Sequence, residues 1–199
     1  MFYHKIKKIA EIFFIYFRLY ELKIEKTTFL SFKLDSNFEF RILNENDIIF
    51  FQNFNLPKRY IDIYINRFKN KTHKCFAVFD KNTSKLVYYS WINFEKKTYC
   101  RELKRNLYLK EKNACLFEDD NTHLDYRKNK LHTFIMNERI KFCKSLNLER
   151  IYIIIHPNNI PAIKTINKFN FVKTFHIPIK FRENTLHLLS NKITSIWKN

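Results

Sequence analysis

The chain contains no glycine in 199 residues. Average usage of about 7% would place about 14 glycines in a chain of this length. Glycine adopts a left-handed backbone without steric cost, so each turn or helix end that needs this conformation must use another residue, for which asparagine is best suited. Any motif that depends on glycine is therefore lost or rewritten here.

Composition limits the class of protein. With 46% hydrophobic and 28% charged residues, the chain can bury a real core, which excludes a wholly disordered protein. No apolar stretch reaches the roughly 18 residues of a membrane-spanning helix. The over-used residues are lysine, asparagine, isoleucine, phenylalanine and tyrosine, whose codons are A/T-rich, so part of the composition reflects drift in an A/T-rich genome.

The formal net charge is +18, from 37 basic and 19 acidic residues. Such a charge can indicate nucleic-acid binding, but here the lysines are spread along the chain without a run of five or six basic residues. We therefore favour a solvated basic surface and expect no nucleic-acid partner. An anionic ligand or an anionic membrane surface is the alternative.

The cysteines are Cys75, Cys100, Cys115 and Cys143. They are widely spaced, with no CxxC pair and no neighbouring pair of histidines. This spacing argues against a zinc site and against a disulfide framework. It predicts buried, reduced thiols in a cytoplasmic protein that holds no metal.

The N-terminal segment combines a basic start with apolar residues at helical spacing, namely Ile6, Ile9, Phe13, Phe17 and Tyr20. No small-residue cleavage site follows, so a signal peptide is not indicated. We expect an amphipathic helix within an N-terminal extension, residues 1–36. This helix packs on its own domain or on a second subunit of a homodimer, or lies on an anionic membrane as a peripheral contact.

Strand-like and helix-like segments alternate in the domain expected over residues 37–199. Strands are predicted at 38–43, 74–79, 85–94, 114–122, 151–155 and 171–181, with an inserted strand pair within 98–109. Helices are predicted from the cap Asn44 to about Phe54 and at 58–69, 131–146 and 160–169. This order predicts an α/β fold whose second half contains a βαβ crossover.

Three segments, in this order, resemble the GNAT superfamily of acyl-CoA N-acyltransferases. They are FRILNENDIIF (40–50), ACLFEDDNTHLDYRKNKLH (114–132) and NIPAIKTINKFNF (159–171). The resemblance implies a mixed, mostly antiparallel central sheet flanked by helices, acetyl-CoA or another acyl-CoA as co-substrate, and a small-molecule amine acceptor. It is nearest to the branch encoded beside surface-polysaccharide genes, which implies an amino sugar or a nucleotide-linked amino sugar as acceptor.

The resemblance also implies which residues bind the cofactor. Pantetheine would pair with the end of the central strand, and the pyrophosphate would meet the amides of the loop that follows. The residues at these positions are Asn121, Thr122, His123, Arg127, Lys128, Asn129, Lys130, Leu131 and His132, with Asn159 of the later motif as a further contact.

The chain departs from the family pattern at several positions. The family loop reads Arg or Gln, two residues, Gly, one residue, Gly or Ala, whereas this chain has Arg127, Lys130 and His132. Lys130 must swing aside if the ligand is to reach the amides, and His132 either packs inward or crowds the loop. Asn170 stands where the family has a helix-ending glycine. Ile166 stands where many relatives have a tyrosine general acid.

Three consecutive acidic residues, Glu118, Asp119 and Asp120, lie on the central strand. Strand alternation predicts that Asp119 faces away from its two neighbours. Asp119 matches a carboxylate of the resembling branch, so we expect it to deprotonate or orient the amine. The alternative is an exposed acidic strand end that balances nearby lysine and arginine.

Two aromatic residues, Tyr89 and Trp91, lie on one face of their strand and either line the acceptor pocket or belong to the core. His123 either relays a proton or is a surface histidine. A catalytically inactive GNAT-like interaction module is the rival to an enzyme, and the filled glycine positions favour it. A nucleic-acid binder would need a localised basic patch with interleaved aromatics, which the sequence lacks.

Overall fold

The computed structural model describes residues 16–100, 105–109 and 111–178 of the chain. The described residues form a seven-stranded sheet of order β2-β3-β4-β7-β8-β1-β9 and a separate β5-β6 pair. Neighbouring strands are antiparallel except β7 and β8, which are parallel. The strands are β1 (Tyr16–Lys23), β2 (Phe38–Leu43), β3 (His73–Asp80), β4 (Lys85–Asn93), β5 (Lys97–Cys100), β6 (Arg105–Tyr108), β7 (Ala114–Thr122), β8 (Arg150–Ile155) and β9 (Val172–Pro178).

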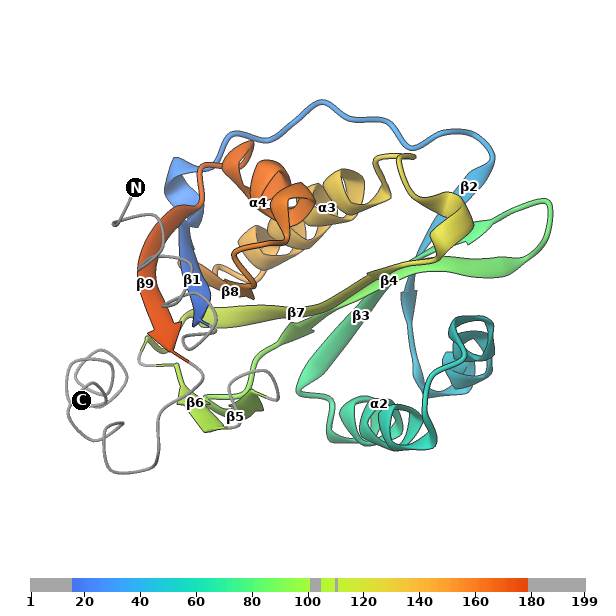
Figure 1. Cartoon of the computed structure of the whole chain (residues 1–199), viewed down its shortest axis with the longest axis horizontal. Helices are drawn as coiled ribbons and strands as arrows, with labels where there is room; N and C mark the ends of the chain where they lie inside the picture. The colour runs from blue at the N-terminus through green and yellow to red at the C-terminus, as the bar shows by residue number, and fades with distance from the viewer. Residues whose placement is uncertain (1–15, 101–104, 110, 179–199) are drawn as a thin grey trace, which may run out of the picture.

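Helices cover both faces of the large sheet. Figure 1 shows α3 (Leu131–Ser145) and α4 (Ile160–Asn167) on one face and α2 (Lys58–Asn70) on the other, where the 3-10 helix η2 (Glu45–Phe54) joins it. Each face has its own core. Met136 and Ile140 of α3 pack in one, whereas Phe51 of η2 and Tyr64 of α2 pack in the other. The sheet thus separates a layer formed by α3 and α4 from a layer formed by η2 and α2.

The N-terminal helix prediction is wrong for residues 16–23, which form β1. This strand lies between β8 and β9 and pairs with both, so its backbone groups are satisfied on each side by the sheet. Leu19 packs toward one core and Tyr20 and Leu22 toward another, which is the alternation of a strand and not a helical stripe. Tertiary pairing therefore overrides the helical spacing of Phe17 and Tyr20, and the predicted positions before residue 16 lie outside the described part.

The remaining predicted elements agree with the structure within a few residues, with one difference in kind. Residues 45–54 form a 3-10 helix, not an α-helix. Its predicted cap is present, because Asn44 Oδ1 accepts from the Asn46 amide at 2.9 Å and Asp47 Oδ2 accepts from the Asn44 amide at 2.8 Å. The inserted strand pair is β5 and β6. All four cysteines are buried and outside any disulfide, as predicted.

Asparagine, serine and charged residues take over the backbone role of glycine. Left-handed backbone occurs in the described residues at Asn55, Lys71, Ser84, Asp119, Lys128, Lys130, Asn147 and Asn170. Asn170, which follows α4, has the left-handed backbone that was predicted for this position, with φ 64°. Asp119 and Lys130 have φ values of 53° and 58°, and both lie where the sequence places a functional site. A residue with a Cβ atom is disfavoured there by about 1–2 kcal/mol, so the surrounding fold must impose the conformation.

Candidate active site

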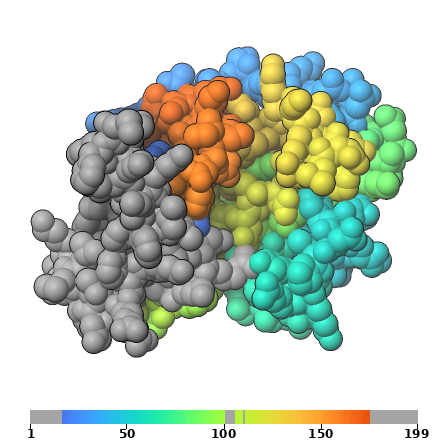
Figure 2. Space-filling view, viewed as in Figure 1, coloured from blue at the N-terminus to red at the C-terminus, as the bar shows by residue number. Residues whose placement is uncertain are grey.

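The central feature of the site is the point where β7 parts from β8. Residues 114–117 of β7 pair with residues 150–153 of β8, and beyond Phe117 β7 keeps only its pairing with β4. The space-filling view shows the loop after β7 (yellow) and α4 (orange) facing each other across this part of the surface (Figure 2). The end of β7 therefore has an edge without a protein strand beside it among the described residues, and such an edge can accept an extended ligand.

A bulge changes the direction of the acidic side chains on β7. The pairing register with β4 shifts between Tyr89 and Trp91, opposite Asp119, whose φ is 53°. Glu118 and Asp119 consequently reach the same guanidinium on the α2 side, whereas Asp120 turns to the α3 side. The prediction that Asp119 faces away from both neighbours is therefore wrong, because simple alternation does not hold through a bulge.

Arg67 of α2 holds the two carboxylates on that side. Its Nη1 donates to Asp119 Oδ2 and its Nη2 contacts Glu118 Oε1, each at 2.6 Å. The guanidinium also lies over the rings of Trp91 and Tyr64, at 5.2 and 5.4 Å. Burial works against its charge, but Glu118 and Asp119 outweigh burial and raise the pKa of Arg67. The permanently charged Arg67 thus fixes the orientation of the Asp119 carboxylate.

Asp119 and Asp120 both line a cavity of about 440 Å³ between the sheet and the η2–α2 layer. Its other lining residues come from η2, the following turn, α2 and the central strands: Phe54, Asn55, Leu56, Pro57, Arg59, Tyr60, Tyr64, Tyr89 and Asn121. The wall is about equally polar and apolar, with aromatic rings on several sides, the Asp119 carboxylate at one side and Arg59 as a cation. A small amine with a ring or chain attached matches these walls in size and polarity.

Two phenols and an amide form a polar contact along the cavity wall. The Tyr64 and Tyr89 hydroxyls are 3.2 Å apart, and Asn121 Nδ2 donates to the Tyr89 hydroxyl at 3.1 Å. Burial, with Asp119 as a second cause, raises the pKa of Tyr64, and burial also raises the pKa of Tyr89. Both phenols therefore stay protonated and act as hydrogen-bond donors or acceptors, not as bases.

The opposite side of β7 carries a second, more enclosed polar group. Asp120 Oδ1 accepts from the Tyr88 hydroxyl at 2.6 Å and from Arg139 Nη2 at 2.7 Å. Arg139 is completely buried and its guanidinium lies 4.2 Å from the centre of the Phe117 ring. These contacts hold the Asp120 carboxylate on the α3 side of the sheet, whereas Arg67 holds the Asp119 carboxylate on the α2 side.

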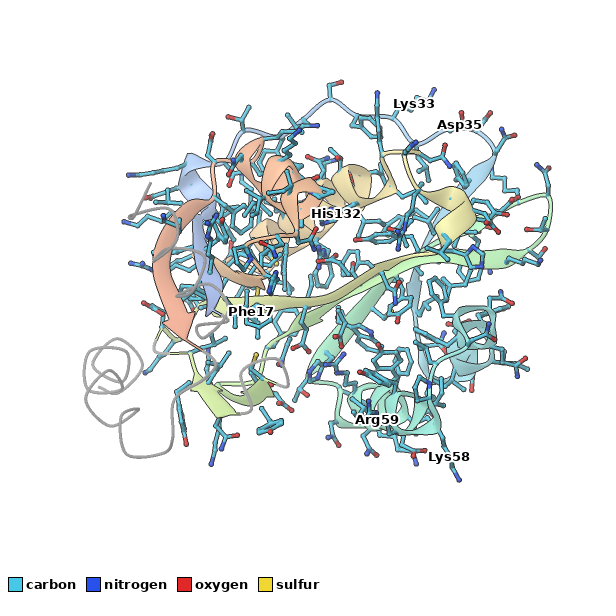
Figure 3. The ribbon with its side chains drawn as sticks, in the orientation of Figure 1. Phe17, Lys33, Asp35, Lys58, Arg59 and His132 are labelled. Atoms are coloured by element: carbon cyan, nitrogen blue, oxygen red, sulfur yellow. The ribbon has the colours of Figure 1, made fainter. Side chains whose placement is uncertain are left out.

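His132 turns inward from the first turn of α3. Its ring stacks on Tyr88 with centroids 6.3 Å apart, and Nε2 lies 3.9 Å from Asp120 Oδ1. Burial and the Arg139 charge lower the pKa of His132, although Asp120 opposes them. Figure 3 shows His132 on the α3 side of the sheet, away from Arg59 and Lys58 on the α2 side. His132 therefore packs instead of crowding the loop.

The loop between β7 and α3 retains a shape that can bind an anion. Lys130 is the N-cap of α3 with φ 58°, and it makes no side-chain cap hydrogen bond. Phe134 makes the first backbone bond of the helix, to the Lys130 carbonyl, so the amides of Leu131 to Thr133 have no acceptor within the helix. The Lys130 ammonium lies 5.8 Å from the centre of the Phe32 ring. The residues present therefore fit a pyrophosphate, which uncapped helix amides bind well.

The other predicted site residues lie at different places. Thr122 ends β7, and the His123 amide donates to the Val87 carbonyl at 2.9 Å. Arg127, Lys128 and Asn129 are exposed on the loop before α3. Asn159 caps α4, with Oδ1 accepting from the Ala162 amide at 3.3 Å.

Of the two aromatic residues predicted for the acceptor pocket, only Tyr89 lines the cavity. Trp91 is 0% exposed and packs behind the wall against Phe51, Tyr64 and Phe68. The two residues do share a face of β4, as predicted. Trp91 supports Arg67 and does not contact the cavity, which corrects the expectation that it lines the acceptor pocket.

Sequence reasoning missed Arg67, Tyr64 and Arg139. Arg67 and Tyr64 lie three residues apart in a predicted helix, so they share a face, and that spacing was the available signal. Nothing in the sequence connects that face with residues 118 and 119, which are about fifty positions further on. Arg139 reads as an ordinary charged position in α3, and its burial follows only from the packing of α3 on β7.

Within the described ranges, no cluster of three or more His, Cys, Asp or Glu side chains is arranged to hold a metal ion. None of the helices in that part of the chain is long and apolar enough to cross a membrane.

Comparison with known proteins rests on structure alone. No protein-family model and no curated protein matches the sequence. A tandem GNAT protein from the clavulanic acid biosynthesis pathway matches with a TM-score of 0.62 and 9% identity, over 83% of this chain and 52% of its own. The chain thus spans about half the length of that protein.

Two further solved structures match over almost their whole length. A predicted acetyltransferase from Clostridium acetobutylicum, solved with acetyl-CoA, has a TM-score of 0.51 and 14% identity over 75% of this chain and 97% of its own. A ribosomal-protein-S5-alanine acetyltransferase from Vibrio fischeri has a TM-score of 0.53 and 17% identity over 78% and 98%. These likenesses show that the chain has the GNAT fold.

Proposed function

We propose that this protein transfers an acetyl or other short acyl group from acyl-CoA to a primary amine, with Asp119 as the residue that orients or deprotonates the amine. The observation that carries the proposal is the position of the Asp119 carboxylate. It lies in the wall of the 440 Å³ cavity, on the bulge where β7 leaves β8, and Arg67 holds it from behind. The GNAT fold supports the same chemistry, since the similar proteins include acetyltransferases.

The acyl-CoA would lie along the parted end of β7, in contact with Asn121, Thr122 and His123. Its pyrophosphate would meet Arg127, the loop Lys128–Asn129–Lys130 and the amides of Leu131 and His132, with Asn159 across the groove. When bound, the co-substrate supplies a reactive thioester. The left-handed Lys130 and the inward position of His132 leave the amides accessible without any glycine.

The reaction needs little from the protein. The amine nitrogen forms a bond to the thioester carbon and the carbon–sulfur bond breaks, so one proton must leave nitrogen and one must reach the thiolate. Asp119 takes the first proton directly or through water. Ile166, at the position where many relatives have a tyrosine acid, is completely buried. The thiolate therefore receives its proton from water or by return of the proton that Asp119 accepted.

For the acceptor we propose an amino sugar or a nucleotide-linked amino sugar, as in the branch that the sequence resembles. The cavity supports this choice through aromatic walls at Phe54, Tyr60 and Tyr89, on which a sugar ring can stack, and through Asn121 and Arg59 as polar contacts. We place the reaction in the cytoplasm, where buried thiols stay reduced. The homodimer and membrane contacts proposed for the N-terminus lie mainly outside the described residues.

The rival proposal is an inactive GNAT-like interaction module, suggested by the filled glycine positions. The filled glycine positions are a weaker argument for the inactive module once two features of Lys130 are considered. Lys130 adopts the left-handed backbone that glycine would supply, and the Lys130 ammonium lies over the Phe32 ring. The two proposals differ in one measurable property. An enzyme must bind acyl-CoA at this loop, and an inactive module has no such need.

Thermal unfolding with acetyl-CoA tests the proposal. A ligand at 100 times its dissociation constant should stabilise the folded state by about 2.7 kcal/mol. Arg127→Ala should weaken binding by about 1.5–3 kcal/mol, the usual loss for a hydrogen bond to a charged group. Lys141→Ala, an exposed change on the same helix layer, is the matched control and should bind normally. No stabilisation of the wild-type protein, with the fold intact, would favour the inactive module.

A further inference from the structure

The cavity wall carries a buried polar cluster that takes no part in the proton transfers proposed above. It consists of Tyr64 from α2, Tyr89 from β4 and Asn121 from β7, and all three residues line the cavity. Tyr64 and Tyr89 are only 2% and 1% exposed. Buried polar groups in folded proteins normally have hydrogen-bond partners, so each hydrogen of this phenol–amide cluster should have an acceptor.

The phenol–amide cluster has more polar hydrogens than internal hydrogen bonds. Each phenol has one polar hydrogen, and the Asn121 amide has two. The Tyr64 and Tyr89 hydroxyls lie 3.2 Å apart, and Asn121 Nδ2 donates to the Tyr89 hydroxyl at 3.1 Å. Whichever phenol donates, the first contact uses one phenol hydrogen, and the second contact uses one amide hydrogen. One phenol hydrogen and one amide hydrogen therefore remain.

No described residue accepts the remaining phenol hydrogen. Within the described ranges, the Tyr64 and Tyr89 hydroxyls make only the two contacts within the cluster. Leaving a buried donor without an acceptor is costly. Solvent in the cavity can serve as acceptor, but a ligand that fills the cavity must replace it. The unpaired hydrogen thus marks a place where the cavity receives an oxygen atom from a ligand.

The phenol–amide cluster lies next to the candidate base. Asp119 and Asn121 are two residues apart on β7, and both line the cavity, at a strand spacing of about 7 Å. The Arg67 guanidinium, which holds Asp119, lies 5.4 Å from the centre of the Tyr64 ring. A ligand whose amine binds Asp119 therefore presents the atoms beside its amine to the two phenols.

We propose that the phenol–amide cluster selects amine acceptors that carry a hydroxyl on the first or second carbon beyond the carbon that bears the amine. The inference rests on the proposed function in taking this cavity as the acceptor site. The ligand hydroxyl accepts the spare phenol hydrogen while Asp119 holds the amine. It narrows the acceptors to amino alcohols, a class that includes amino sugars, and disfavours plain alkylamines.

A hydroxyl suits the phenol–amide cluster better than an ether or a carbonyl oxygen. A hydroxyl both accepts and donates, whereas the other two oxygens only accept. Among the described residues, Asn121 Oδ1 has no hydrogen-bond donor, and its Nδ2 is bonded to Tyr89. One ligand hydroxyl can thus take the phenol hydrogen and give its own hydrogen to Asn121 Oδ1.

The phenols remain donors under the conditions in which amines react. Burial, with Asp119 as a second cause, raises the pKa of Tyr64, and burial also raises the pKa of Tyr89. A rising pH deprotonates the amine, which the reaction needs, while both phenols keep their hydrogens. The preference for a hydroxyl should therefore be the same at neutral and at moderately alkaline pH.

A matched set of amines tests the proposal. trans-2-Aminocyclohexanol differs from cyclohexylamine by one hydroxyl beside the amine, and acetyl-CoA-dependent release of thiol follows their acetylation. We expect kcat/KM to be about ten- to a hundredfold higher for the amino alcohol, as for a hydrogen bond whose loss leaves a buried donor unpaired. 4-Aminocyclohexanol, whose hydroxyl lies across the ring, should resemble cyclohexylamine.

Phenylalanine variants keep the rings and remove the hydroxyls. The double variant Tyr64→Phe/Tyr89→Phe should reduce the preference for trans-2-aminocyclohexanol about ten- to a hundredfold, because it has no phenol hydrogen. Tyr64→Phe alone leaves the Tyr89 hydrogen without a protein acceptor, so the preference should fall by less than about threefold. Differences in intrinsic reactivity between the two amines cancel when a variant is compared with the wild type. Tyr108→Phe, at an exposed tyrosine of β6, is the matched control and should keep the wild-type preference.

Thermal unfolding tests the same preference without turnover. At equal concentration, trans-2-aminocyclohexanol should raise the melting temperature of the wild-type protein more than cyclohexylamine does, because only the amino alcohol satisfies the spare donor. The double variant should lose this difference and Tyr108→Phe should keep it. If the double variant does not fold, the wild-type comparison still decides.

Three outcomes would overturn the proposal. They are equal kcat/KM for trans-2-aminocyclohexanol and cyclohexylamine with equal stabilisation by both, a preference that survives in the double variant, and complete loss of the preference in Tyr64→Phe alone. A protein that acetylates no amine but is stabilised selectively by the amino alcohol would overturn the proposed function and leave the hydroxyl site supported. The kinetic and thermal measurements thus separate the two proposals.

Discussion

The two halves of β7 serve different purposes although they are one continuous strand. Residues 114–117 pair with β8, Leu116 and Phe117 also pair with β4, and none of the four side chains is more than 3% exposed. Residues 118–122 pair only with β4, contain a bulge, and carry three carboxylates and an amide. The change from ACLF to EDDNT marks where a buried core strand becomes the floor of a site. The first half of β7 therefore anchors the strand in the core, and the second half carries the polar side chains of the candidate site.

The largest expected effect is on turnover, from Asp119→Asn in the second half of β7. The asparagine keeps the size of the side chain but removes its charge and basicity, so turnover should fall by about 10²–10⁴ with acetyl-CoA affinity nearly unchanged. The measurement is acetyl-CoA-dependent release of thiol with a panel of amino sugars and nucleotide-linked amino sugars. Asp120→Asn is the matched control. Full turnover of Asp119→Asn together with loss in Asp120→Asn would move the base to the α3 side.

Phe117→Ala, two residues earlier, should destabilise the fold, because Phe117 belongs to the buried first half of β7. The ring is 1% exposed and lies under the Arg139 guanidinium, so its removal leaves a cavity and should lower the free energy of unfolding by about 3–5 kcal/mol. Urea denaturation followed by circular dichroism measures this change. Asp119→Asn measured in the same way should lose clearly less. Equal losses in the two variants would mean that the halves are not distinct.

Lys130→Gly tests the loop that follows the second half of β7. Glycine removes the Cβ penalty of the left-handed conformation, so we expect a gain in stability of up to about 1 kcal/mol and a preserved or improved affinity for acetyl-CoA. Calorimetry measures the affinity and thermal unfolding the stability. Lys71→Gly, a left-handed lysine at the end of α2, is the matched control. A large loss of affinity in Lys130→Gly alone would show that the lysine has become a phosphate ligand.

The smallest expected effect is a pH dependence at His132. Its pKa is lowered in the folded state, so the unfolded chain binds the proton more strongly, and stability should fall as the pH drops below the ordinary value of 6.5. His132→Gln should flatten this part of the curve of unfolding free energy against pH. His123→Gln, at a partly exposed histidine, is the control. An unchanged acid limb in His132→Gln would show that His132 does not have a lowered pKa.

Much of the fold could be predicted from the amino-acid sequence because the signals involved are local. Alternation in FEFRIL, the Asn44 cap, the Asp80–Ser84 turn and the β-branched run of β8 each depend on neighbours in the chain, and each is found as predicted. The order of these elements and the three resembling segments were enough to expect the GNAT fold. The substitution of asparagine for glycine at Asn170 was equally readable, since left-handed tolerance belongs to the residue type.

The geometry of the site and the strand at residues 16–23 depend on long-range contacts and could not be predicted from local sequence. Residues 16–23 became β1 because pairing with β8 and β9 satisfies their backbone, a contact more than one hundred residues away in sequence. The bulge at Asp119 reversed the expected alternation, and Arg67 reached Glu118 and Asp119 from a helix about fifty residues earlier. Long-range pairing and buried charge have no local signature, because their free energy depends on which distant groups the fold brings together.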